Sequence, residues 1–168
     1  MELRAAIETR VSAARLQDPG PTSEHLELIL AAAARAPDHG RLRPWRFMLL
    51  DDARRRSFAE AAALAKRARV PTLTDEQVAA DRDKILRSPT LIIAACIVRR
   101  DQNKIPEVEQ LVATAAATQN LFLAAHDLGY GVMWKTGAAA YDDRVKGMLG
   151  LDSGDHIVGI MHLGTRAA

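Results

Sequence analysis

The chain has 168 residues, enough for one hydrophobic core, and a net charge of only +2, which argues against a dedicated nucleic-acid or polybasic membrane binder. A single cysteine, Cys96, excludes an intramolecular disulfide and fits a reducing compartment. The start, MELRAAIETR, carries charges where a signal peptide needs an apolar centre, and no stretch reaches the roughly 20 apolar residues of a membrane span. We therefore expect a soluble, cytoplasmic protein forming one domain over residues 1–168.

Hydrophobic periodicity in the first half predicts helices, turns and one strand. Thr22 and the TDEQ sequence at 74–77, which has the form of a capping box, are typical helix starts. The PGP sequence at 19–21 predicts an exposed connection. The run WRFMLL at 45–50 predicts a buried strand. The expected helices lie at 2–9, from Thr22 to about Arg35, at 53–69, and from TDEQ to about Arg87.

The second half predicts a strand, a long helix and three short elements. TLIIAACIV at 90–98 is continuously apolar, which indicates a strand without a wet face. Pro106 and Gly129 delimit a helix of about 22 residues. It is apolar nearly all round, which favours burial at a subunit interface. Strands at 130–135 and 156–164 and a helix in YDDRVKGMLG complete an α+β domain.

Most sequence signatures of catalysis and metal binding are missing. The chain has no glycine-lysine phosphate loop, dinucleotide fingerprint, HExxH sequence, cysteine pair or nucleophile elbow. His156 and His162 share a strand but lie too far apart to hold a metal alone, so we expect satisfied or exposed histidines and no metal site. Cys96 is interpreted as inert packing. An enzyme of this kind would rely on a bound organic cofactor.

Several motifs follow one another over about residues 7–165: ETRVS, RAPDHGRLRPWRF, NKIPEVEQ, GYGVMWKTG and IVGIMHLGT. No single motif is specific, but their order and spacing resemble the nitroreductase family of flavin enzymes, and its small bacterial branch in particular. The resemblance implies a mixed sheet of about four strands flanked by helices. It also implies a homodimer, with a long central helix at the interface and FMN in a cleft between the subunits.

The resemblance implies a phosphate site after the first helix and a contribution from the second subunit. The family's Arg-x-Ser element, which holds the phosphate and ribityl end of FMN, matches Arg10, Val11 and Ser12. A guanidinium and a short hydroxyl suit a phosphate dianion, although the family commonly has a second arginine where this chain has Val11. An arginine and a histidine that contact the neighbouring subunit's cofactor match Arg35 and His39.

The WKTG segment resembles the family sequence beside the isoalloxazine ring, which implicates Trp134, Lys135 and Thr136. A cation at Lys135 would stabilise the reduced flavin. The implied activity is ping-pong electron transfer from NADH or NADPH to a nitroaromatic, quinone or similar small acceptor. No catalytic side chain is expected, because the flavin carries the chemistry.

A non-catalytic or degenerate flavin-binding homodimer is the alternative. Arg43 stands where the family usually has glutamine, Val11 departs from the Arg-x-Ser pattern, and the sequence ends at LGTRAA where family members usually continue over the partner subunit. A yellow protein that does not oxidise NAD(P)H would separate this alternative from the enzyme. The sequence does not identify the physiological acceptor, the preferred nicotinamide nucleotide or the role of Arg43.

Each candidate residue also has a purely structural interpretation. Arg10 and Arg35 could bind the last carbonyl groups of their helices. Ser12 and His39 could be turn residues, and Lys135 could be a solvated strand end. Trp134 could be a core aromatic, which is the interpretation we keep for Trp45. The ARRRS and AKRAR clusters are interpreted as solvent-exposed faces of one helix.

Overall fold

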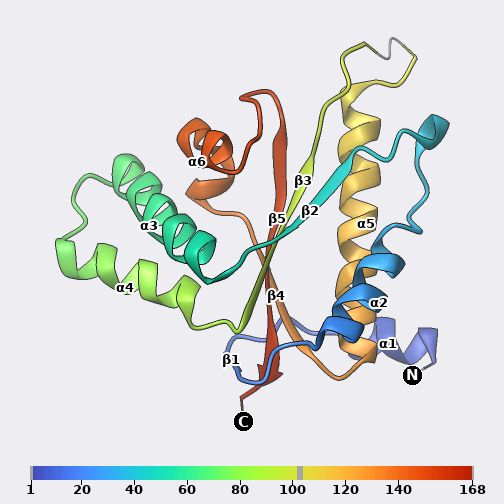
Figure 1. Ribbon diagram of the computed structural model, residues 1–168, viewed down its shortest axis with the longest axis horizontal. Coiled ribbons are helices and arrows are strands. Elements are labelled where there is room, and N and C mark those ends of the chain that lie inside the picture. The colour runs from blue at the N-terminus through green and yellow to red at the C-terminus, as the bar shows by residue number, and fades with distance from the viewer. Residues whose placement is uncertain (1, 102–103, 168) are drawn as a thin grey trace.

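The computed structural model describes residues 2–101 and 104–167 as a sheet with helices on both faces (Figure 1). Helices α1, α2 and α5 lie on one side of the sheet, and α3, α4 and α6 lie on the other. The helices are α1 (Leu3–Thr9), α2 (Ser23–Ala33), α3 (Asp52–Arg69), α4 (Asp75–Leu86), α5 (Glu107–Asp127) and α6 (Asp143–Met148), with 3₁₀ turns η1 (His39–Arg41) and η2 (Ala138–Tyr141). The strands are β1 (Leu16–Gln17), β2 (Trp45–Leu49), β3 (Thr90–Cys96), β4 (Gly131–Lys135) and β5 (His156–Arg166).

Strand β5 organises the sheet. It pairs with β3 along one edge, and with β4 and then β1 along the other, always antiparallel. Strand β2 pairs with β3, and the parallel contact is an isolated bridge between Ser12 and Val132. The four longer strands match the predicted ones, and β1 adds a short strand to the connection that the sequence predicted to be exposed.

Two apolar clusters fix the sheet between its helix layers. Because strand side chains alternate between faces, Ile160 packs toward α3 and α6 while Met161 and Leu163 pack toward α2 and α5. Strand β3 is buried along its whole length, as predicted. Its consecutive residues Leu91 and Ile92 point to opposite faces and enter opposite clusters.

Strand β2 differs from its prediction. It was expected to be buried, but it lies at the edge of the sheet with β3 as its neighbour, and its residues are half-buried or exposed. Leu49 is 47% exposed, and Trp45, predicted to be a core residue, is half-buried. An apolar run alone does not reveal whether a strand lies at the centre or the edge of a sheet.

The predicted helix starts are confirmed. The Thr22 side chain accepts a hydrogen bond from the His25 N–H, and Thr74 and Gln77 form a reciprocal capping box. In this single chain α5 is buried along one face only, since Val108 and Val112 are 63% and 62% exposed. None of the helices within the described residues combines the length and apolar character needed to cross a membrane.

The prediction that the ARRRS cluster is a solvated helix face is wrong at Arg55. Its side chain is only 15% exposed. The guanidinium donates hydrogen bonds to the carbonyl oxygens of Pro89, Leu86 and Ser88, at 2.8, 3.0 and 2.6 Å. These carbonyls lie at the end of α4 and in the turn into β3, so Arg55 joins α3 to the α4–β3 connection.

Candidate cofactor site

The end of β4 lies between two cavities. Trp134, Lys135 and Thr136 line both of them, one toward α1 and α5 and the other beneath α3 and α4. On its edge away from β5, strand β4 is bridged to Ser12 at Val132, and no further bridge follows toward Lys135 among the described residues. The chain leaves it at Gly137, whose φ of 67° belongs to the left-handed region that favours glycine. This open strand end makes backbone and side chains accessible to a ligand.

The first cavity, of about 490 Å³, holds the residues predicted for a phosphate. Arg10 and Ser12 line it together with Gln119 and Phe122 of α5. The Arg10 guanidinium carbon lies 4.8 Å from the centre of the Phe122 ring, a cation–π contact that limits the motion of a long side chain. Among the described residues, the Arg10 side chain has no carboxylate partner.

His126 extends the same region toward β5. Arg166 lies 3.1 Å from His126 Nδ1, and because a guanidinium only donates, Nδ1 accepts and Nε2 carries the hydrogen. The Nε2–H group then donates to Thr9 Oγ1 at 2.9 Å. Burial and the positive charges of Arg166 and Arg10 lower the pKa of His126. Arg166 therefore contacts the imidazole directly, whereas Arg10 acts on it through its charge.

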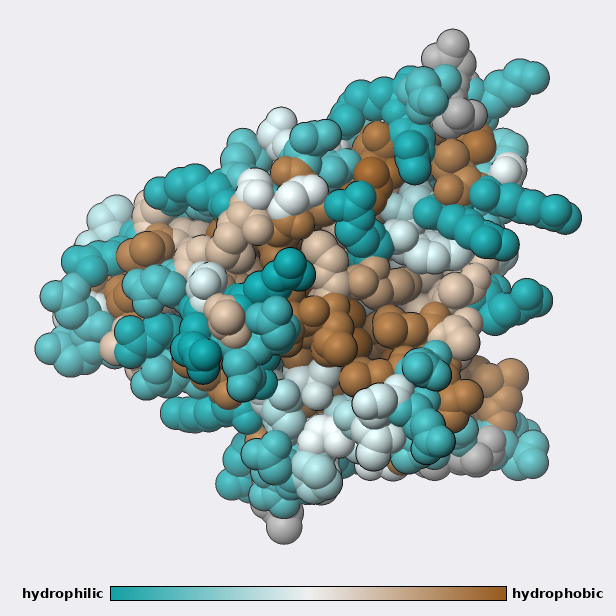
Figure 2. All heavy atoms as spheres, in the orientation of Figure 1, coloured by the Kyte–Doolittle hydropathy of each residue, from teal (hydrophilic) through white to brown (hydrophobic). Residues whose placement is uncertain are grey.

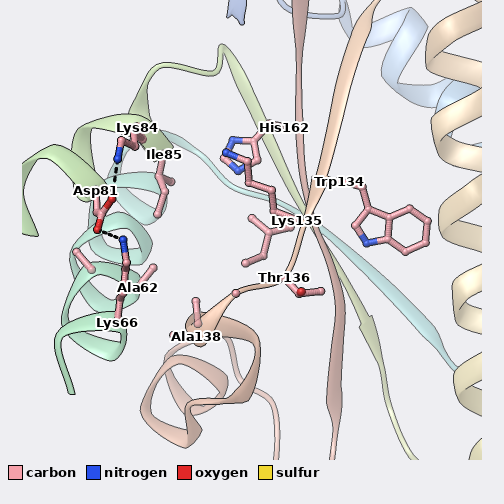
Figure 3. A pocket seen from close by; sticks show the side chains of 14 residues that line it. Ala62, Lys66, Asp81, Lys84, Ile85, Trp134, Lys135, Thr136, Ala138 and His162 are labelled. Carbon is pink, nitrogen blue, oxygen red and sulfur yellow. Dashed lines mark hydrogen bonds and ion pairs between the residues drawn. The ribbon is translucent and has the colours of Figure 1, made fainter. Parts of the chain in front are cut away.

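The second cavity, of about 470 Å³, lies beneath α3 and α4 (Figure 3). Its wall on the α3–α4 side carries an ion cluster in which both Lys66 and Lys84 donate to Asp81. Hydrogen bonds from these two lysines lower the pKa of the Asp81 carboxyl. Its remaining wall is mostly apolar, formed by Ala62, Ala63, Ile85, Ala138, Ala139 and Ile160.

Two polar side chains extend from the sheet toward this cavity. Lys135 and His162 point to the α3–α4 side, whereas the Trp134 indole lies on the opposite side of the sheet (Figure 3). His162 is 3% exposed, and its Nδ1 lies 2.7 Å from Ser88 Oγ. Burial, and then the charges of Lys135 and Arg55, lower the pKa of His162 to about 4, so the ring is neutral near pH 7.

The two strand histidines are paired and Cys96 is packed in the core, as expected from the sequence. His156 Nε2 lies 2.6 Å from a Glu107 carboxylate oxygen, so both strand histidines have partners. Cys96 is fully buried, and burial raises the pKa of its thiol. In the described part of the chain, no group of three or more His, Cys, Asp or Glu residues is arranged to hold a metal ion.

The position of Trp134 is fixed by its surroundings. Its indole N–H donates to the Val158 carbonyl oxygen at 2.9 Å. A Cβ atom on Gly159 would lie 2.8 Å from the indole nitrogen, so glycine is required where the ring crosses β5. Trp134 therefore has a structural role in addition to lining both cavities.

The other two predicted residues lie elsewhere in this chain. Arg35 and His39 line neither cavity, and both are exposed beyond the end of α2. His39 Nδ1 lies 2.7 Å from a Glu109 carboxylate oxygen. The turn is held by Asp38, which accepts the Arg43 backbone N–H at 2.7 Å. Arg43 adopts a φ of 48°, an uncommon conformation for a residue with a side chain.

Several lining residues had no signal in the sequence. Phe122 and Gln119 belong to an apolar helix, and Lys84 lies in a polar helix without a recognisable motif. Ser88 and His162 are 74 residues apart, and their pairing depends on the register of β5 against β3. Such residues become visible only when the fold brings them together.

The chain matches the family model described as Nitroreductase family over residues 7–165. It is 33% identical over 167 residues to the Escherichia coli protein named "Putative NAD(P)H nitroreductase YdjA", covering 98% of this chain and 88% of that protein. Among solved structures, a nitroreductase-like family protein from Bacillus cereus aligns with a TM-score of 0.80 and 27% identity, covering 100% of this chain and 87% of that one. A Desulfovibrio desulfuricans protein solved in complex with FMN aligns with a TM-score of 0.76 and 24% identity, over 100% and 88% of the two chains.

Proposed function

This chain belongs to the nitroreductase family, and from that premise we propose that it is an FMN-dependent oxidoreductase. It takes electrons from NADH or NADPH and passes them to a nitroaromatic, quinone or similar small acceptor. Donor and acceptor use the same cleft in turn, which is ping-pong kinetics. The buried, lone Cys96 supports a cytoplasmic location for this reaction.

One observation carries the proposal: the Trp134–Thr136 segment lines two cavities of different chemistry. The first offers a guanidinium without a carboxylate partner at Arg10, beside the hydroxyl of Ser12. The second has mostly apolar walls, with the lysines Lys66, Lys84 and Lys135 also lining it. A ligand with a dianionic end and a flat aromatic end fits this pair, and FMN has that form.

The chain's own residues bind and orient the cofactor in this proposal. Arg10 and Ser12 donate to the phosphate, and Trp134 and Thr136 support the ring from the strand. Lys135 brings a positive charge to the ring's edge, where it stabilises negative charge in a site partly shielded from water. Bound FMN supplies the electron-transfer chemistry, for which the described side chains offer no group.

A second copy of the chain completes the proposed site. Exposed apolar side chains occur on α1 and α5, including Leu3, Ile7, Val108 and Val112. Figure 2 shows hydrophobic atoms exposed on the side of the molecule where these helices lie. Covering this surface with a second copy supports a homodimer. Arg35 and His39 would then reach the partner's cofactor.

The test is the visible spectrum of the purified protein after FMN is added and unbound FMN is removed. We expect a retained flavin band, followed by oxidation of NADH or NADPH that depends on a nitroaromatic or quinone acceptor. A folded but colourless protein would overturn the proposal. A yellow protein that oxidises neither nucleotide with any acceptor would indicate the non-catalytic alternative.

A further inference from the structure

His162 has one ring nitrogen that the fold leaves unused. The side chain is 3% exposed and lines the cavity beneath α3 and α4 as well as the adjoining space beside Arg87 and Ser88. Its Nδ1 is paired with Ser88 Oγ at 2.7 Å, whereas Nε2 has no hydrogen-bond partner among residues 2–101 and 104–167. Nε2 is nevertheless not sealed in the interior. It therefore opens onto one of the two spaces that the side chain lines.

The contact with Ser88 fixes which nitrogen carries the hydrogen. Ser88 is 5% exposed, and its hydroxyl has no other partner in the described part of the chain. If Nδ1 carried the hydrogen, the buried hydroxyl hydrogen would have no acceptor, which is costly. The hydroxyl therefore donates to Nδ1, and the neutral ring presents Nε2–H to the cavity.

The surroundings select the partner of this N–H group. Apolar side chains such as Ala62, Ile85 and Ile160 form much of the wall. Lys135 stands on the neighbouring strand, and Lys84 across the cavity is already bonded to Asp81. A neutral donor among apolar walls suits a carbonyl oxygen or ring nitrogen of a flat ligand. A phosphate dianion is better served by the guanidinium in the other cavity.

We propose that His162 is a cofactor-binding residue whose Nε2–H donates a hydrogen bond to an acceptor atom of the isoalloxazine ring, with Ser88 as the positioning residue that fixes the tautomer. This inference rests on the proposed FMN function. It assigns to the last strand a ring contact that the sequence motifs did not indicate. The contact orients the ring at the end of β4, between Lys135 and the α3–α4 layer.

The test compares FMN with riboflavin, which has the same ring but no phosphate. For His162→Phe, which keeps a ring but loses the donor, we expect the Kd of both ligands to rise about 5- to 10-fold. His162→Gln, whose amide N–H lies near the position of Nε2–H, should recover most of the affinity. Circular dichroism establishes that each variant is folded.

A second measurement uses the wild-type protein. With ¹⁵N-labelled histidine, NMR should show one neutral ring with its hydrogen on Nε2, and this signal should shift when riboflavin is added. In Ser88→Ala both tautomers should be populated, which a merely space-filling serine would not cause.

The outcomes separate the two claims. Wild-type protein that binds neither flavin would overturn the proposed function and this inference together. Wild-type protein that binds both flavins, with His162→Phe binding them equally well, would overturn the inference alone. A loss confined to FMN would place His162 at the phosphate and would also overturn it.

Discussion

The Arg10 guanidinium lies over the face of the Phe122 ring, 4.8 Å from its centre, which joins the end of α1 to the middle of α5. This cation–π contact holds a permanent cation at the cavity wall, and no carboxylate among the described residues pairs with its N–H groups. An arginine held in this way loses little side-chain entropy when an anion binds. Arg10 is therefore the strongest candidate for binding the phosphate end of a ligand.

Replacing Arg10 with alanine should weaken FMN binding about 10- to 100-fold, because a charge-assisted contact to a phosphate is lost. Riboflavin, which has no phosphate, should bind with nearly unchanged affinity. Flavin fluorescence titration gives both dissociation constants. Arg4→Ala is the matched control, since Arg4 is an exposed arginine of α1, the helix that Arg10 follows, and is paired with Glu8. Full FMN occupancy in Arg10→Ala would count against the phosphate assignment.

Features encoded within a few residues were predictable from the sequence. The Thr74 capping box joins residues three positions apart, and the apolar run of β3 identifies a strand buried on both faces. The edge position of β2 is not local, because it depends on which strands pair beside it. The role of Arg55 is hidden for the same reason, since its partners lie 31 to 34 residues further along the chain.

The candidate site also combines residues that local motifs predict with residues that only the fold brings together. Motifs placed Arg10, Ser12 and the Trp134–Thr136 segment together, and the structure brings these residues to the wall of one cavity. Lys84 and His162 were not predicted as site residues, because a lysine in a polar helix and a histidine in an apolar strand carry no local signal. The structure of one chain does not bring Arg35 to this cavity, so its role remains a prediction about the dimer.

Arg55→Met should destabilise the protein by about 2–3 kcal/mol, because three partly buried carbonyl groups at the end of α4 and in the turn into β3 lose their charged donor. Methionine keeps much of the apolar stem, so the loss reports mainly on the hydrogen bonds. Urea unfolding provides the free-energy difference. Arg56→Met, at an exposed position of the same helix, should change stability by less than about 0.5 kcal/mol. Equal effects of the two substitutions would contradict the role assigned to Arg55.

The stability of the protein should fall as the pH is lowered from about 6.5 to about 4, owing to His162. Burial and nearby cations lower its pKa in the folded state from 6.5 to about 4. Between these values the unfolded chain binds a proton that the native protein does not, so stability rises with pH across this window. Above pH 6.5 the contribution of His162 to the free energy of unfolding is fully present, and it amounts to about 3 kcal/mol at most.

Urea midpoints measured from pH 7 to pH 4 test this dependence. His126, whose pKa is also lowered, contributes in the same direction. The pKa of Asp81 is lowered from 3.8 in the folded state, so the stability that its carboxylate contributes is lost only in more acidic solution. His162→Phe should therefore flatten the dependence without abolishing it. An unchanged slope in this variant would show that His162 protonates as readily in the folded protein as in the unfolded chain.

A mixed dimer can test whether each cofactor site uses both subunits. Arg10 lines the cavity within one chain, whereas Arg35 is exposed and would act on the partner's cofactor. In a dimer of one Arg10→Ala chain and one Arg35→Ala chain, one site then carries both defects and the other carries none. We expect tight binding of one FMN per mixed dimer, measured by titration after purification with two different affinity tags.

The corresponding homodimers provide the contrast. Each Arg10→Ala or Arg35→Ala homodimer has a defect in both sites and should bind FMN weakly throughout. A dimer of Arg10→Ala with the wild-type chain should keep one tight site, which provides the reference value for one tightly bound FMN per dimer. If Arg35 instead acted within its own chain, the doubly substituted mixed dimer would have a defect in each site and no tight binding. Recovery of one tight site therefore requires that Arg35 crosses between subunits.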